Sequence, residues 1–205
     1  MKNRYCLLLL LFITTFASAQ KKREISIAFV NAASAYPFSQ FSRLATGIAQ
    51  PGVEAGYGFN WKTKSRHDWY QEIKFGYLYH RYVQHALSLY SDVGYRYKFS
   101  KHWIAQSALG AGYLHSIPAT AKLKLNNIGE YKNDKGIGRA QAMAVLNFTA
   151  GYILNSLSGR PLKIFITYQQ LLQTPFVKAY VPILPYNSLL IGASVRYHHL
   201  KNKKT

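Results

Sequence analysis

Residues 52–62 read GVEAGYGFNWK, and the pattern in this stretch decides the fold. Large or apolar side chains alternate with small or polar ones along it. One face carries Val53, Ala55, Tyr57, Phe59 and Trp61, and the other carries Glu54, Gly56, Gly58, Asn60 and Lys62. A period of two residues is typical of a β-strand whose two faces meet different surroundings.

The same alternation recurs along the chain. It is clear in residues 69–80, 86–99, 102–114, 141–154 and 188–198. Residues 162–172 show it less regularly, and residues 24–31 form a short eighth candidate. Strands of about 9–14 residues are longer than the usual globular strand and match a tilted membrane-spanning strand. Past the N-terminal region, no stretch has the run of about 18 apolar residues that a transmembrane helix requires.

The direction of the apolar face separates two kinds of barrel. In a soluble lipocalin-like carrier the apolar face points inward, whereas in a membrane barrel it meets lipid and the polar face fills the lumen. The polar face of this chain is rich in glycine, which suits a narrow lumen, and aromatic residues gather near the strand ends. We therefore predict an all-β, antiparallel up-and-down transmembrane β-barrel of eight strands. The soluble periplasmic carrier stays open as an alternative.

The N-terminal region has the three-part pattern of a secretory signal peptide. Lys2 and Arg4 precede an apolar run over residues 6–16, and Ala17-Ser18-Ala19 then matches an A-x-A cleavage site. We expect Sec-type export to remove residues 1–19, residues 20–200 to form the barrel, and residues 201–205 to be a basic tail. The single cysteine, Cys6, lies within the signal, so we expect neither a disulfide framework nor a thiolate metal site.

The lengths of the connections predict the orientation. With a periplasmic N-terminus, the outer connections are residues 32–51, 81–85, 115–140 and 173–187, and the inner ones are residues 63–68, 99–101 and 155–161. Most of the outer connections are long and all of the inner ones are short. This asymmetry is typical of outer-membrane barrels.

The net charge is strongly positive. The chain has 26 Lys and Arg against 7 Asp and Glu, a formal charge of +19. Such a charge can indicate a nucleic-acid partner, but export beyond the inner membrane excludes one. We expect basic residues at the periplasmic rim to contact phospholipid headgroups, namely Lys62, Lys64, Arg66, Lys98, Lys101 and Arg160. Basic residues in the outer connections are expected to meet lipopolysaccharide phosphates.

Several charged residues fall on the inward face of the predicted strands. They are the acids Glu54, Glu72 and Asp92 and the bases Lys74, Arg96 and Arg196. An eight-stranded barrel is just wide enough for side chains to fill it, and buried charges must be paired. We therefore predict a structural ion-pair network in the lumen, with a polar-ligand site or an ion path as the alternative.

The chain resembles the small eight-stranded outer-membrane β-barrel proteins of Gram-negative bacteria. The resemblance is carried by the signal end Ala17-Ser18-Ala19-Gln20, by strand segments such as residues 56–59 and 110–114, and by the last strand. It implies recognition by the outer-membrane assembly machinery, whose last-strand signal Gly192, Val195 and Tyr197 match in part. Members include adhesins, plugged structural barrels and lipid A-modifying enzymes, so the fold alone does not name the function.

The resemblance also raises an enzymatic alternative, a lipid A-modifying hydrolase of the outer leaflet. Lipid A deacylases of this kind pair a His with a Ser two positions later on the same outward face. Here His115 and Ser116 are adjacent, and adjacent strand residues point to opposite faces, so they cannot act as base and nucleophile. We expect no catalytic residue, no cofactor and no metal site. The predicted function is a non-enzymatic role in envelope structure or surface binding.

Overall fold

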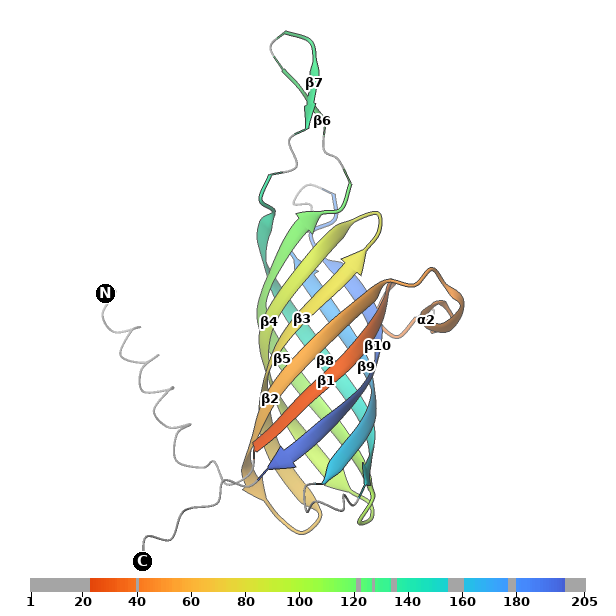
Figure 1. Ribbon diagram of the computed structural model, residues 1–205, viewed down its shortest axis with the longest axis vertical. Helices are drawn as coiled ribbons and strands as arrows, with labels where there is room; N and C mark the ends of the chain where they lie inside the picture. Colours follow the sequence, from red (N-terminus) through yellow and green to blue (C-terminus); the bar gives the residue numbers. More distant parts are fainter. Residues whose placement is uncertain are drawn as a thin grey trace, which may run out of the picture.

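The computed structural model describes residues 23–39, 41–120, 123–126, 128–133, 136–154, 161–176 and 180–197. Within these ranges, eight long antiparallel strands close into one barrel (Figure 1). The strands are β1 (Arg23–Ser34), β2 (Pro51–Thr63), β3 (His67–His80), β4 (Gln84–Lys98), β5 (Trp103–Pro118), β8 (Arg139–Leu154), β9 (Leu162–Thr174) and β10 (Leu184–Tyr197). The predicted fold class is confirmed. Residues 1–22 and 198–205 lie outside the described ranges, so the signal peptide and the basic tail stay predictions.

The short candidate strand at residues 24–31 is a full strand that closes the barrel. β1 pairs with β10 from Arg23 opposite Tyr197 to Ser34 opposite Tyr186, and on its other side it pairs with β2. Every other pairing joins two strands that follow one another in the chain, except that the hairpin of β6 and β7 stands between β5 and β8. This up-and-down order leaves no unpaired sheet edge among the eight described strands, which is the condition for spanning a bilayer with strands.

The two ends of the barrel differ in their connections. Short connections join the strands at the lower rim, where β1 begins and β10 ends. At the upper rim the connection of residues 81–83 between β3 and β4 is also short, and the other three are longer. One upper connection contains the short helix α2 (Arg43–Thr46), and another contains the hairpin β6 (Leu123–Leu125) and β7 (Tyr131–Asn133). In Figure 1 the hairpin extends along the barrel axis, whereas α2 lies beside the barrel.

The apolar face of each strand points outward. Phe29 is 76% exposed and Leu109 is 67% exposed, and similar residues surround the barrel. The inward face holds buried polar and charged side chains. A lipocalin-like carrier would bury the apolar face and present the polar one to water, so the structure contradicts that alternative. Among the described residues, no helix is long and apolar enough to cross a membrane.

Candidate functional site

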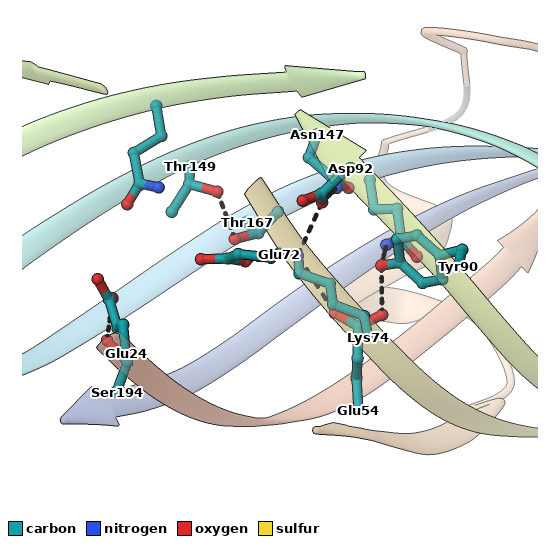
Figure 2. A network of polar contacts seen from close by, with 12 residues as sticks. Glu24, Glu54, Glu72, Lys74, Tyr90, Asp92, Asn147, Thr149, Thr167 and Ser194 are labelled. Atoms are coloured by element: carbon teal, nitrogen blue, oxygen red, sulfur yellow. Dashed lines mark hydrogen bonds and ion pairs between the residues drawn. The ribbon is translucent and has the colours of Figure 1, made fainter. Parts of the chain in front are cut away.

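The middle of the lumen is organised around one lysine. Lys74 on β3 extends toward three carboxylates, which come from β2, β3 and β4 (Figure 2). Its Nζ lies 3.6 Å from Glu54, 3.3 Å from Glu72 and 3.2 Å from Asp92. The lysine side chain is 12% exposed, and a cation buried to this degree is stable only with partners of opposite charge.

Glycines opposite these charges make room for them. In the strand pairing, Glu54 faces Gly76, Gly56 faces Lys74 and Gly58 faces Glu72, while Asp92 faces Gly110. A Cβ at Gly58 would lie 2.8 Å from Cγ of Glu72, and one at Gly110 would lie 2.7 Å from Cβ of Asp92. The glycines of the inward face therefore create the space that the central cluster occupies.

Neutral donors add hydrogen bonds to two of the three carboxylates. The Tyr90 hydroxyl donates a hydrogen bond of 2.6 Å to Glu54 and accepts one of 2.9 Å from Gln169. The Asn147 amide donates a hydrogen bond of 2.9 Å to Asp92. These donors come from β4, β8 and β9, so the central cluster links strands on opposite sides of the barrel.

A second cluster lies toward the lower rim around Glu24 on β1. Its carboxylate is 3.0 Å from Arg96 and 3.3 Å from Arg196, and it also forms an ion pair with Lys163. The Ser194 hydroxyl donates a 2.6 Å hydrogen bond to the same carboxylate. One side chain thereby connects β1 to β4, β9 and β10.

Asp68 extends this lower cluster. Its carboxylate lies 2.8 Å from Lys98 Nζ and 3.8 Å from Arg96, and the Arg96 guanidinium packs 4.9 Å from the centre of the Tyr70 ring. Arg96 is 1% exposed, so it sits fully inside the barrel between two acids and an aromatic ring. These contacts offset the cost of burying the guanidinium, although its Nε and Nη1 form no hydrogen bond within the described residues.

The structure brings the six predicted lumen residues into these two clusters. Glu54, Glu72, Lys74 and Asp92 form the central cluster, and Arg96 and Arg196 belong to the lower one. Sequence reasoning missed Glu24 and Asp68, because the first begins the shortest candidate strand and the second was assigned to a connection. The alternation does contain both, since each directly precedes an outward apolar residue, Ile25 or Trp69.

The side chains leave little free space around the central cluster. The cavity that Lys74 and its partners line has a volume of about 20 Å³, which is room for about one water molecule. An apolar layer lies above the central cluster, toward the upper rim. It consists of Ala86, Leu114, Met143, Val145 and Leu171 with the rings of Tyr90 and Tyr186. Beyond it, Gln84 donates hydrogen bonds to Gln173 and Tyr186. The described lumen is thus occupied by three successive layers of side chains.

The predicted rim residues lie in two places. Lys62, Lys64, Arg66 and Lys101 are exposed near the lower rim, and Arg160 lies outside the described residues. Lys62 and Lys64, with His67, Trp69 and Tyr95, line a pocket of about 200 Å³ on the barrel surface. Lys98 has the inward phase of Arg96 and lies at the lower end of the lumen, where its Nζ pairs with Asp68 and donates a 3.4 Å hydrogen bond to the Lys64 carbonyl. Its contact with lipid headgroups stays a prediction.

The residues considered for lipid A hydrolysis are separated by the barrel wall. Ser116 is 3% exposed and contacts Gln84 in the lumen, whereas His115 lies on the outer face with hydrogen bonds to Tyr113 and the Ile137 carbonyl. His115 therefore cannot act as a base for Ser116 as a nucleophile. Among the described residues, no group of three or more His, Cys, Asp or Glu side chains could hold a metal ion.

Comparison with solved structures identifies the fold. Neisserial surface protein A has a TM-score of 0.54 and 9% identity, and the match covers 87% of this chain and 96% of that protein. The chain has the fold of a small outer-membrane β-barrel.

Two further structures align with this chain at lower scores. Ail, the attachment invasion locus protein of Yersinia pestis, in complex with the heparin analogue sucrose octasulfate, has 11% identity and a TM-score of 0.46, with 87% and 99% coverage. The outer membrane enzyme PagL has 11% identity and a TM-score of 0.44, with 86% and 99% coverage. No protein-family model and no curated protein matches the chain.

Proposed function

We propose that this chain is an integral outer-membrane barrel with a filled lumen, which serves envelope structure or surface binding and catalyses no reaction. The observation that carries the proposal is the inverted distribution of side chains. Apolar residues cover the outer wall, while ten charged residues pair inside the barrel. A lipid bilayer is the surrounding that stabilises such a wall. Export to a Gram-negative outer membrane through the signal at residues 1–19 belongs to the proposal.

The packed lumen supports a structural or binding role over transport. A conducting barrel needs a continuous aqueous path, whereas here ion pairs, an apolar layer and a glutamine cluster follow one another along the axis. Purified protein in planar bilayers should therefore give no steady single-channel steps. Reproducible steps from the wild-type chain would contradict the filled lumen and favour the ion path.

The lower rim supports anionic phospholipids as partners. Two lysines and a histidine line the surface pocket beside Trp69 and Tyr95, and amphipathic aromatic rings of this kind favour the headgroup level. The two lysines can bind the phosphate of a headgroup, while the two aromatic rings lie at the level of the membrane interface. We further propose lipopolysaccharide as a partner at the upper rim and the outer-membrane assembly machinery as a partner during insertion through β10.

Membrane fractionation tests the proposal. The chain should stay with the outer membrane after carbonate extraction, and the unheated protein should migrate faster in gel electrophoresis than the boiled protein. Release into the soluble fraction would overturn the membrane assignment. Mass spectrometry of lipid A from cells with and without the protein tests the enzymatic alternative, and loss of an acyl chain only in its presence would overturn the non-enzymatic role.

A further inference from the structure

The outer wall near the upper rim carries polar side chains on β1, β9 and β10. Asn31, Gln170 and Asn187 point outward, because the residues on either side of each point into the lumen. Most other residues on this face are apolar and exposed, yet Gln170 is 4% exposed and Asn187 is 0% exposed. A part of the chain must therefore cover them from outside.

The cover is the connection between β1 and β2, residues 35–50, which we call the lateral loop. The Asn187 amide donates hydrogen bonds of 3.1 Å to the Tyr36 carbonyl and 2.7 Å to the Ser39 carbonyl. The backbone N–H of Phe38 donates one of 3.4 Å to the Gln170 side chain. Wall side chains thus satisfy backbone groups of the loop, which would otherwise need water.

Asn31 holds the other half of the lateral loop. Its amide donates a 2.8 Å hydrogen bond to the Leu44 carbonyl of α2, and its carbonyl oxygen accepts one of 2.9 Å from the Gln50 N–H. Leu44 itself is buried. The helix α2 is therefore fixed against β1 and β10 and does not extend above the rim, as Figure 1 shows.

Aromatic contacts show how far the lateral loop descends. The Phe38 ring lies 5.9 Å from the Tyr168 ring and 6.4 Å from the Phe148 ring, and the Phe41 ring lies 5.2 Å from Tyr168. Tyr168 pairs with Leu189 on β10, and Leu189 pairs with Asn31 on β1. Tyr168 therefore lies at the level of Asn31, three residues before the end of β1. The loop leaves the barrel at the rim and turns back along the outer wall.

The exposed surface of the lateral loop continues the apolar wall. The next outward residues below it are Phe29, Ile166 and Ile191, all exposed. The loop adds Tyr36, Phe41 and Ile48, which are 79%, 53% and 67% exposed, and one exposed basic residue, Arg43. Apolar and aromatic side chains beside a basic residue are typical of a segment that lies in a membrane interface.

We propose that the lateral loop lies in the membrane interface, with Tyr36, Phe41 and Ile48 in contact with lipid acyl chains and Arg43 against a lipid phosphate. The proposal rests on the membrane location proposed above. The hydrogen bonds that Asn31, Gln170 and Asn187 form with the backbone of the lateral loop support this location, because polar backbone groups cannot be left unsatisfied in lipid. The loop then widens the lipid-binding surface on one side of the barrel.

Single-cysteine labelling tests the proposal. Cys6→Ser removes the one cysteine of the full chain, and an environment-sensitive fluorophore is attached at Phe41→Cys, at Leu89→Cys on the outer wall, or at Ile128→Cys on the β6–β7 hairpin. The protein is refolded in phosphatidylcholine vesicles with brominated acyl chains. The labels at positions 41 and 89 should lose most of their fluorescence to brominated lipid and resist aqueous iodide. The label at position 128 should respond in the opposite way.

The two reference positions separate the two proposals. A label that is quenched by lipid at position 89 but by iodide at position 41 overturns the lateral-loop inference and leaves the membrane assignment intact. A label that is quenched by iodide at both positions, in protein that shows the gel mobility of the folded barrel, overturns the membrane assignment itself.

Two variants test how the lateral loop is held and what Arg43 does. Asn187→Leu should increase the quenching by iodide of the label at position 41. Gln71→Leu, which removes another outward hydrogen-bonded amide, should leave that quenching unchanged. An unchanged label in Asn187→Leu would overturn the anchoring. Adding brominated phosphatidylglycerol should increase quenching at position 41, and Arg43→Gln should abolish that increase. An increase that persists in Arg43→Gln would overturn the phosphate contact.

Discussion

Lys74 carries one positive charge into a group of three carboxylates, and neutral donors offset the excess of acceptors. Tyr90 and Asn147 each donate a hydrogen bond into the group, at 2.6 Å and 2.9 Å. Removing the cation would leave negative charges facing one another in a water-poor space. The stability of the central cluster therefore depends on this single ammonium group more than on any one of its acids.

The Lys74→Met variant tests this dependence. We expect a loss of about 3–5 kcal/mol in the free energy of unfolding, the usual cost of leaving a buried charge without its partner. Urea titration of the refolded protein in vesicles, followed by gel mobility, measures it. Lys62→Met, at an exposed site on β2, should stay within about 0.5 kcal/mol. Equal effects of the two substitutions would contradict the central role of Lys74.

Tyr90 offers a finer test, because only its hydroxyl joins the cluster. In Tyr90→Phe the ring stays, while Glu54 loses a donor and Gln169 loses an acceptor. Leaving buried polar groups unsatisfied should cost about 1–3 kcal/mol in the same urea titration. Tyr113→Phe is the matched control, since its hydroxyl bonds His115 on the exposed face. If the control loses as much stability, the lumen contacts of Tyr90 contribute little.

At the scale of the elements, the period of two residues was enough to predict all eight strands, whereas the outward direction of the apolar face was inferred from the glycines of the polar face, the aromatic strand ends and the signal-peptide pattern. Strand ends were harder, because the alternation fades there. β5 continues to Pro118 past the predicted end at residue 114, and β3 begins at His67. That earlier start is why Asp68 was missed. The ion pair between Lys98 and Asp68 was missed for the same reason.

The partners of a buried charge could be predicted only in part. Inward phase identified Glu54, Glu72, Lys74 and Asp92, because the four lie on adjacent strands. It could not show that Glu24 meets Arg96, because that contact crosses the lumen between strands that are not neighbours. The lateral loop was likewise hidden, since its contacts with β9 and β10 depend on how the chain turns back outside the barrel.

The glycines of the inward face give a prediction at the element scale. A Cβ at Gly112 would overlap the Leu89 carbonyl, which the strand pairing holds in place, so Gly112→Ala should cost about 1–3 kcal/mol. At Gly151 the nearest atom, 3.0 Å away, belongs to the Ile104 side chain and not to the backbone, and Gly151→Ala should cost less. The fraction of each variant that reaches the fast-migrating folded form measures the difference. The reverse order would show that backbone crowding does not limit this barrel.

At the scale of the whole molecule, the charges divide into a neutral inside and a basic outside. The described lumen holds five acids and five bases in ion pairs: Glu24, Glu54, Asp68, Glu72 and Asp92 with Lys74, Arg96, Lys98, Lys163 and Arg196. The excess of +19 is therefore carried by the rest of the chain. This division is why we propose the rims, and not the lumen, as the surface for anionic partners.

The double variant Lys62→Gln/Lys64→Gln tests the lower rim as a lipid-binding surface. We expect weaker retention of phosphatidylglycerol over phosphatidylcholine, by about 1 kcal/mol for each lysine, because each loses its attraction to the anionic headgroup. Native mass spectrometry of the protein released from mixed vesicles measures the bound lipids. Arg81→Gln, at the upper rim, should leave phosphatidylglycerol retention at the lower rim unchanged. An unaltered lipid ratio in the double variant would contradict the headgroup site.

The Glu24 cluster also constrains the timing of membrane insertion. Glu24 stands on the first strand and its partner Arg96 on β4, but Lys163, Ser194 and Arg196 belong to the last two strands. A growing sheet that entered the bilayer strand by strand would carry a carboxylate that lacked two of its three counter-charges until β9 and β10 arrived. Insertion should therefore be late and nearly simultaneous for all strands, and a nascent chain that ends before β9 should wait outside the bilayer.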